Sequence, residues 1–82
     1  MATFRPHFSL AELMGSHEKQ WSSASLGDMI EEGTKEFGTG FRDELKKATI
    51  LVNGRAVSYL KGMSTPLNDG DEVWSVLPAG GG

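Results

Sequence analysis

Thr65-Pro-Leu-Asn-Asp-Gly-Asp-Glu-Val-Trp-Ser-Val-Leu-Pro-Ala-Gly-Gly-Gly82 is the most informative stretch of this sequence. Its first half is rich in turn formers, including a proline and an Asp-Gly pair. Residues 73–77 then predict a short strand, and a proline and an alanine lead into three consecutive glycines. Because glycine has no side chain, such a segment is flexible and narrow. We therefore predict one folded domain over residues 1–78 and a flexible glycine tail over residues 79–82.

The glycine tail suggests a chemical role for the end of the chain. A segment without side chains can enter a channel too narrow for other residues and present its terminal carboxylate there. The carboxylate of Gly82 is ionised at neutral pH and is a poor electrophile, so it must be activated, for example as an acyl-adenylate, before it reacts. The pattern predicts a substrate for another enzyme's chemistry. A frayed or engineered glycine end is the alternative interpretation.

The middle of the chain predicts a main helix followed by a hairpin. Ser25 is expected to cap a helix whose apolar positions recur at helical spacing, namely Leu26, Met29, Ile30, Gly33 and Phe37. A glycine inside a helix is unfavourable, so Gly33 indicates a close packing contact at that position. Glycines at 38 and 40 predict the end of this helix, and Phe41 with Leu45 indicates one further helical turn. Residues 48–53 are typical of a strand, and Asn53-Gly54 favours a type I′ turn into a partner strand over residues 55–59.

The N-terminal segment predicts a strand, a short helix and a weaker second strand. Residues 3–8 alternate, with Phe4, Pro6 and Phe8 on one side and Arg5 and His7 on the other. Ser9 is expected to open a capping box, and Gly15 to end that helix. Residues 17–22 indicate the second strand, with Trp21 turned inward. The predicted order is β, short α, β, long α, β-hairpin, β, without an internal repeat.

Composition limits the classes of function. The chain has 82 residues, no cysteine and a net charge of −3, which leaves little room for an enclosed active site and excludes disulfides and thiol nucleophiles. The acidic balance argues against nucleic acid as a partner. No apolar run approaches the ~20 residues that cross a bilayer, so we expect no membrane contact and a cytoplasmic protein.

Metal binding is not expected from the sequence. His7 and His17 lack a supporting set of cysteines or carboxylates, and surface or partly packed histidines explain them better. Asp69, Asp71 and Glu72 lack the spaced ligand loop of a calcium site, which favours a solvated turn.

Several motifs together resemble the ubiquitin-like sulfur carriers of the MoaD/ThiS family. These motifs are Val52-Asn-Gly, the segment from Thr65 to Val73, and the strand, proline and glycines that follow it. The segment from Phe8 to Gly15 also resembles the helix that this family places after its first strand. The resemblance covers essentially the whole chain. It implies an α+β fold of the β-grasp (ubiquitin-like) type, with a mixed sheet of about five strands around one main helix.

The resemblance also implies a function. An E1-like enzyme would use ATP to adenylate the carboxylate of Gly82, beside Gly81, and a sulfur donor would convert the adenylate to a thiocarboxylate. The chain would bind no cofactor and would not be an enzyme by itself. The large subunit of molybdopterin synthase is a further candidate partner. The tail has only Pro78 where the molybdopterin branch has two prolines. We expect the sulfur to be delivered to the molybdopterin or tungsten-pterin pathway, and the thiamine and cysteine pathways are the alternatives.

Strand alternation predicts a docking surface beside the tail. By alternation Val73, Ser75 and Leu77 share one face of the strand. Val73 continues a position that is buried in the family, so Trp74 and Val76, on the other face, should face outward. An exposed aromatic side chain next to a reactive terminus is typical of a docking site, and Pro78 and Gly80 would extend it. The alternative for Trp74 is packing under the 60–68 loop. A second functional class also stays open, a ubiquitin-like modifier that is joined through Gly82 to lysines of target proteins.

Overall fold

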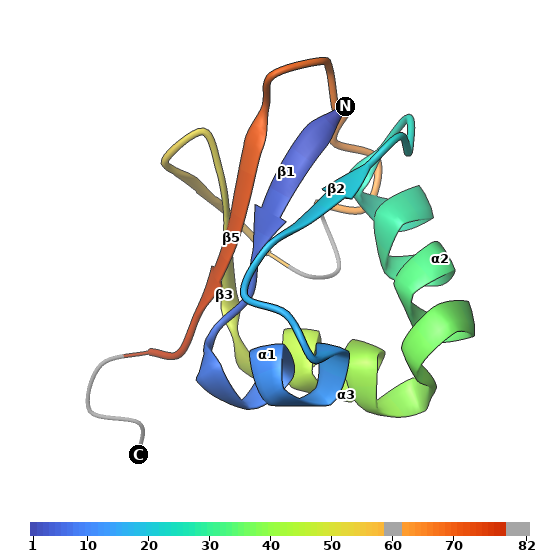
Figure 1. Ribbon diagram of the computed structural model, residues 1–82. Helices are drawn as coiled ribbons and strands as arrows, with labels where there is room; N and C mark the ends of the chain where they lie inside the picture. The colour runs from blue at the N-terminus through green and yellow to red at the C-terminus, as the bar shows by residue number, and fades with distance from the viewer. Residues whose placement is uncertain (59–61, 79–82) are drawn as a thin grey trace.

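The computed structural model describes residues 1–58 and 62–78 of the chain (Figure 1). Within these ranges the protein forms three helices and one five-stranded sheet. The elements, in chain order, are β1 (Ala2–Arg5), α1 (Phe8–Met14), β2 (Lys19–Trp21), α2 (Leu26–Phe37), α3 (Thr39–Lys47), β3 (Thr49–Val52), β4 (Arg55–Val57) and β5 (Glu72–Val76). The predicted tail lies outside the described residues, and with it the predicted site residues Gly80, Gly81 and Gly82.

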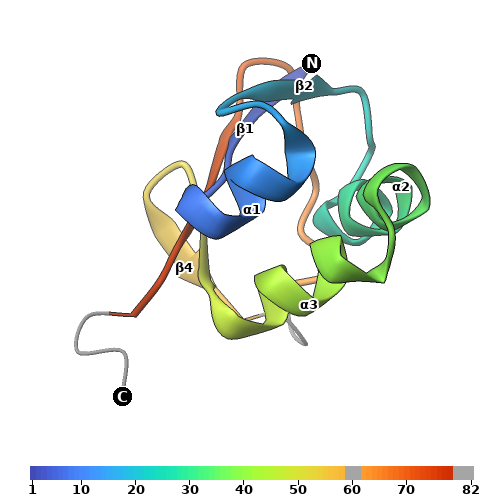
Figure 2. The ribbon, with the colours of Figure 1, turned by 60° about the horizontal axis from the view of Figure 1, so that its bottom comes forward.

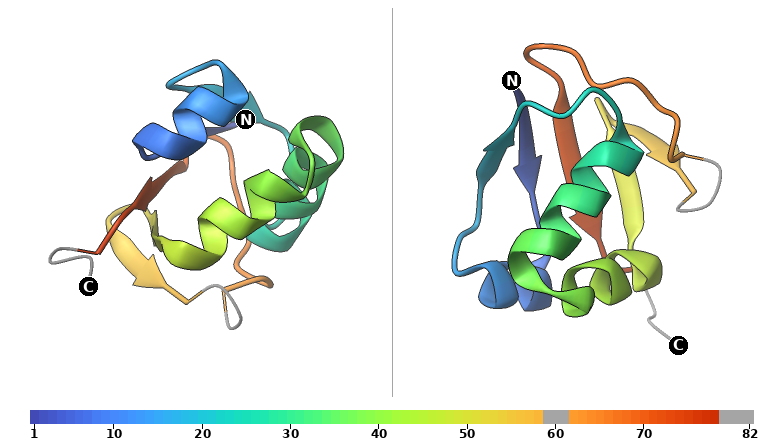
Figure 3. Two further views of the ribbon diagram at one scale, coloured as in Figure 1. Left: turned by 90° about the horizontal axis from the view of Figure 1, so that it is seen from below. Right: turned by 90° about the vertical axis from the view of Figure 1, so that its right-hand side faces the viewer.

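The sheet is mixed, in the order β2-β1-β5-β3-β4. Its two central strands, β1 and β5, run parallel, with Phe4 opposite Val73, and the other pairs are antiparallel. Helix α2 crosses one face of the sheet, while α1 and α3 lie at one end of it (Figure 3, right). This is the predicted β-grasp arrangement, a mixed sheet curved around a main helix.

Aromatic rings form the centre of the core between the sheet and the helices. The Phe41 ring meets those of Phe4 (6.1 Å between centroids), Trp21 (6.2 Å) and Phe37 (5.8 Å). A Cβ at Gly33 would overlap the Phe41 ring, so the predicted close packing contact at this glycine is confirmed. The inward orientation of Trp21 is confirmed as well. The residues that were predicted to pack inward in the main helix and the second strand thus meet in one core.

The helix cap and the hairpin turn that the sequence predicted are both present. The Ser25 side chain caps α2 by accepting a hydrogen bond from the backbone N–H of Asp28, at 3.2 Å. Asn53 and Gly54 have φ angles of 52° and 83°, the pair of positive values that a type I′ turn requires. This turn folds β4 back on β3, with Val52 opposite Arg55.

The sequence prediction was wrong at the end of the first strand. Strand β1 ends at Arg5, and α1 begins at Phe8 with His7 as its cap, so Ser9 is inside the helix and does not cap it. The reason is Pro6, which has no N–H for the sheet ladder and so ends the strand. Alternation no longer applies beyond that point. As a result, His7 is buried, with 8% of its surface exposed, and Phe8 is 70% exposed.

The segment after α2 is also longer than predicted. Helix α3 runs from Thr39 to Lys47 instead of a single turn. It is separated from α2 by Gly38, whose φ of 89° lies in the region that favours glycine. Phe41 and Leu45 are both buried because residues four apart share one face of a helix.

Candidate functional site

Strand β5 carries the predicted docking residues on the sheet face away from α2. Val73 and Ser75 are buried, with at most 1% exposed, whereas Trp74 is 41% and Val76 is 36% exposed. The predicted orientation of Trp74 and Val76 is therefore confirmed, although their binding role stays a prediction. Leu77 was predicted to share the face of Val73, and this is wrong: β5 ends at Val76 and Leu77 is exposed.

The candidate docking surface consists of Trp74, Val76, Leu77 and Pro78, all of them exposed. It lies at the end of the sheet from which the chain continues toward the glycines (Figure 1). Half-buried Leu51 stands opposite Trp74 on β3 and extends the apolar strip. Exposed apolar side chains grouped in this way are typical of surfaces that bind other proteins.

Charged groups border the docking surface on its β1 side. The Arg5 guanidinium lies 5.2 Å from the centroid of the Trp74 ring, close enough for a cation–π contact. Arg5 also forms ion pairs with Glu72 and with Glu18, the latter at 3.3 Å. These contacts hold the arginine beside the indole, so the exposed aromatic ring of Trp74 is braced by a guanidinium that is itself paired with two carboxylates.

Phe8 is a candidate binding residue that sequence reasoning missed. It was expected to share the strand face of Phe4, but it is the first residue of α1 and is exposed, whereas Phe4 is buried. The preceding residue, His7, contacts Ser75, so the first turn of α1 lies beside the end of β5 (Figure 2). Pro6 is the signal that could have revealed this, since a proline in a strand pattern marks its end.

A polar network lies under the docking surface and joins β5 to α1 and α3. The His7 ring approaches Ser75 Oγ through Nδ1 (2.7 Å) and Glu44 Oε1 through Nε2 (3.0 Å). The backbone N–H of His7 also donates to Ser75 Oγ, at 3.0 Å. Glu44 further accepts from the Ser9 hydroxyl (2.6 Å) and from Lys47 Nζ (2.9 Å). The side chain of His7 is thus packed and partnered on both ring nitrogens.

These donors change the acidity of Glu44. Hydrogen bonds from Ser9, then Lys47 and then His7 stabilise the carboxylate and lower its pKa from 4.5 to about 2, against a smaller opposing effect of burial. Because the pKa is lower in the folded state, the carboxylate stabilises the fold above pH 4.5 and loses this contribution as the pH falls through about 2.

We expect Glu44→Gln to flatten the loss of stability between pH 4.5 and about 2. The wild type should lose about 1–2 kcal/mol more than the variant across this window, allowing for the partial exposure of the group. Urea unfolding at a series of pH values measures the difference. Equal slopes for the two proteins would show that the Glu44 contacts contribute nothing to the folding free energy.

The carboxylates of the 68–72 turn are engaged by the protein itself. Asp71 accepts from the backbone N–H of Asn68 (2.8 Å) and from Asn53 Nδ2 (3.0 Å), which lowers its pKa. Asp69 pairs with the N-terminal ammonium group, which lowers the pKa of Asp69. These contacts fit the predicted structural turn. In residues 1–58 and 62–78, no three histidine or acidic side chains are grouped as metal ligands, and this includes His7 and His17.

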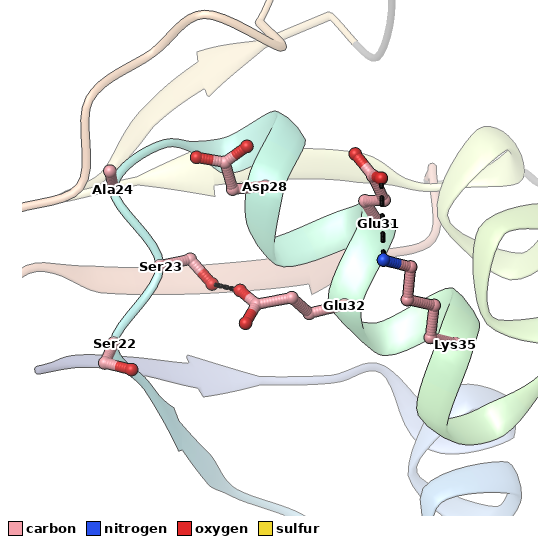
Figure 4. A pocket seen from close by; sticks show the side chains of 7 residues that line it. All are labelled: Ser22, Ser23, Ala24, Asp28, Glu31, Glu32 and Lys35. Carbon is pink, nitrogen blue, oxygen red and sulfur yellow. Dashed lines mark hydrogen bonds and ion pairs between the residues drawn. The ribbon is translucent and has the colours of Figure 1, made fainter.

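A shallow pocket beside α2 is lined mainly by polar and acidic side chains (Figure 4). Ser23 donates a hydrogen bond to Glu32 across it, and Lys35 lies 3.8 Å from Glu31. The pocket adjoins the first turns of α2, at the opposite end of the fold from the last residues of β5 (Figure 1). It is therefore separate from the candidate docking surface at the end of β5.

Known proteins resemble this chain along its whole length. Small archaeal modifier protein 3 of Haloferax volcanii is 36% identical, covering 99% of this chain and 91% of its own. The solution structure of a Haloferax volcanii protein superposes with a TM-score of 0.76 at 30% identity, over 99% of this chain and 85% of that one. The complex of subunits 1 and 2 of Helicobacter pylori molybdopterin-converting factor contains the same fold, with a TM-score of 0.69 at 18% identity over 99% and 97% of the two chains.

The described helices are all too short and too polar to cross a bilayer.

The model of the ThiS family matches residues 9–82, which includes nearly all of α1, the hairpin, β5 and the terminal glycines. With this match and the similarity to the archaeal modifier, the chain belongs to the ThiS family of small ubiquitin-like carrier and modifier proteins.

Proposed function

We propose that this protein is a cytoplasmic sulfur carrier that acts through the carboxylate of Gly82. An E1-like partner would adenylate that carboxylate with ATP, and a sulfur donor would convert the adenylate to a thiocarboxylate. The observation that carries the proposal is the placement of β5. This strand presents Trp74 and Val76 on an open face, and three residues separate its end from the first of the terminal glycines. The ThiS family match, which extends to residue 82, supports the same chemistry.

The proposed reaction has two steps, adenylation of the carboxylate and its conversion to the thiocarboxylate. A carboxylate oxygen of Gly82 attacks the α-phosphorus of ATP, so a C–O–P linkage forms and pyrophosphate leaves. Hydrosulfide then attacks the carbonyl carbon, a C–S bond forms, the C–O bond to AMP breaks, and the thiol proton passes to solvent. Activation is required because the ionised carboxylate has no good leaving group. The carrier supplies the acyl group and the partner supplies the catalytic residues.

The docking surface explains how the partner would recognise the carrier. Two glycines cannot supply much binding free energy, since they have no side chains to bury. Trp74, Val76, Leu77 and Pro78 supply apolar area next to them, with Arg5 as a charged neighbour. Aromatic anchors of this kind dominate the affinity of many protein interfaces. The surface and the tail would therefore bind together, the first for affinity and the second for reaction.

The likeness in fold to molybdopterin-converting factor supports one receiving pathway. Subunit 1 of that factor shares this fold and is bound to subunit 2 in the Helicobacter pylori complex. We propose that this chain likewise delivers sulfur in molybdopterin or tungsten-pterin synthesis, with a large synthase subunit as partner. Sulfur delivery for thiamine or cysteine is the alternative within the same carrier chemistry.

A second function has its own support. The relative that is 36% identical is a small archaeal modifier protein. A modifier would use the same adenylate, but a lysine amine would attack the carbonyl in place of hydrosulfide. The product would be an isopeptide bond from Gly82 to a target protein.

Mass spectrometry of the activated protein separates the two functions. The protein is incubated with ATP, its cognate E1-like enzyme and sulfide, and the intact mass is recorded. The sulfur carrier should gain about 16 Da at the C-terminal residue, from exchange of one oxygen for sulfur. Omitting ATP is the control and should prevent the shift. If no shift occurs and the protein is found instead on lysines of other proteins, the modifier function is correct.

A further inference from the structure

The backbone pairing of β5 is incomplete on one side at its end. On the β3 side, the ladder continues to Thr49 opposite Val76. On the β1 side, it stops at Arg5 opposite Trp74, because Pro6 ends the strand. The last residues of β5 would therefore be held by one neighbouring strand alone, just before the chain leaves the domain.

Ser75 fills this gap with its side chain. Its Oγ accepts a hydrogen bond from the backbone N–H of His7 at 3.0 Å and lies 2.7 Å from Nδ1 of the same residue. Ser75 and His7 are 1% and 8% exposed, so water does not replace these bonds when they are lost. A buried donor or acceptor that loses its partner is costly, which makes this contact a strong local constraint.

The hydrogen-bond pattern assigns the proton positions. Since His7 N–H already donates to Ser75 Oγ, the hydroxyl is satisfied when it donates its own proton to Nδ1. Nδ1 is then the acceptor, and Nε2 carries the ring proton and donates to Glu44 Oε1 at 3.0 Å. Ser9 and Lys47 hold Glu44 in turn. The imidazole thus connects the end of β5 to the first turn of α1 and to the last turns of α3.

We propose that His7 is a positioning residue for the tail: with Ser75 it anchors the end of β5 and fixes where the chain leaves the domain toward Gly82. The proposal rests on the proposed function, because it gives this anchor a consequence for the activating partner. The docking surface and the tail are two linked binding elements. The stiffness of the connection between them sets the effective concentration of the tail in the partner's channel.

Two substitutions of His7 separate its two ring contacts. In His7→Asn, the amide oxygen lies the same number of bonds from the backbone as Nδ1, so it can still accept from Ser75, while the contact to Glu44 is lost. In His7→Gln, the amide nitrogen takes the place of Nε2 and can still donate to Glu44, while the acceptor for Ser75 is lost. Ser75→Ala removes the same contact from the other side, and it also removes the acceptor of the His7 backbone N–H.

Amide hydrogen exchange tests the anchor without any partner. In His7→Gln and Ser75→Ala, exchange at Val76, which pairs with Thr49 of β3, should accelerate about tenfold, as local opening becomes easier, while the amides of α2 keep the wild-type rate. In His7→Asn, exchange at Val76 should stay close to wild type. The double variant His7→Gln/Ser75→Ala should be no faster than Ser75→Ala alone, because Ser75→Ala already removes the side-chain contact that His7→Gln removes. Uniform acceleration across the fold, or additive effects in the double variant, overturns the proposal.

Kinetics of activation test the consequence of the anchor. With the E1-like enzyme and ATP, His7→Gln and Ser75→Ala should raise the KM for the carrier about three- to fivefold and leave kcat within about twofold. The KM of His7→Asn should remain close to wild type. A wild-type KM for His7→Gln overturns the positioning role while the proposed function stands. If the wild type itself is not activated, the proposed function fails, and hydrogen exchange alone decides whether the anchor exists.

Discussion

Replacing Gly81 and Gly82 together by alanine is expected to abolish formation of the thiocarboxylate. The partner must surround the terminal carbonyl closely to adenylate it, and each added Cβ occupies space that the wild-type tail leaves empty. A misplacement of about 1 Å at a reacting centre can cost about a hundredfold in rate. The wild type should gain about 16 Da on incubation with ATP, the E1-like enzyme and sulfide, and the alanine variant should gain none.

The control for this variant is its stability. The described core contains no residue beyond Val73 other than Ser75, so the melting temperature should match that of the wild type. Deleting Gly82 instead keeps two glycines at the end and shortens the chain by one residue. This variant tests the required length of the tail separately from the requirement for residues without side chains. Full activity of the alanine variant would mean that the partner's channel tolerates side chains and that the glycines serve another purpose.

Trp74→Ala is expected to weaken binding to the activating partner by about 2 kcal/mol, or roughly thirtyfold, which is the size found for aromatic anchors at protein interfaces. The physical reason is that Trp74 supplies the largest side chain of the docking surface and is braced by Arg5. Isothermal titration calorimetry with the E1-like enzyme measures the loss. The free energy of unfolding should fall by less than about 1 kcal/mol, far below the 3–5 kcal/mol of a core tryptophan.

Gln20→Ala is a matched control for Trp74→Ala. Gln20 is exposed and lies next to buried Trp21 in β2, so it faces the same side of the sheet as Trp74, but on an edge strand that β1 separates from β5. This variant should bind the partner as the wild type does. If Trp74→Ala unfolds the protein, the tryptophan is part of the core. If both variants bind normally, the partner uses a different surface.

Local signals predicted most of the fold. Ser25, Asn53-Gly54 and the helical spacing from Leu26 to Gly33 each act through residues nearby in sequence, so the sequence alone contains the information. The outward orientation of Trp74 followed from strand alternation, which requires only that the strand exists. The burial of Val73 and the contact between Gly33 and Phe41 agreed with these expectations.

The parts that sequence reasoning missed depend on distant residues. His7 is buried because Ser75 and Glu44 satisfy both ring nitrogens, and these partners are separated from it by 68 and 37 positions. No period or spacing along the chain reveals such a pairing. Phe8 was misplaced for a simpler reason: the alternating pattern was extended across Pro6, where the strand ends.

The parallel pairing of β1 with β5 has a consequence for folding during synthesis. The first strand to leave the ribosome has to wait for the last one, because β5 is the strand that joins β1 to β3. Contacts of such high sequence separation slow folding. A nascent or truncated chain that lacks β5 cannot close the sheet and also lacks the glycines. An activating enzyme that recognises the closed sheet would therefore bind only chains that contain β5, and so would not act on truncated chains.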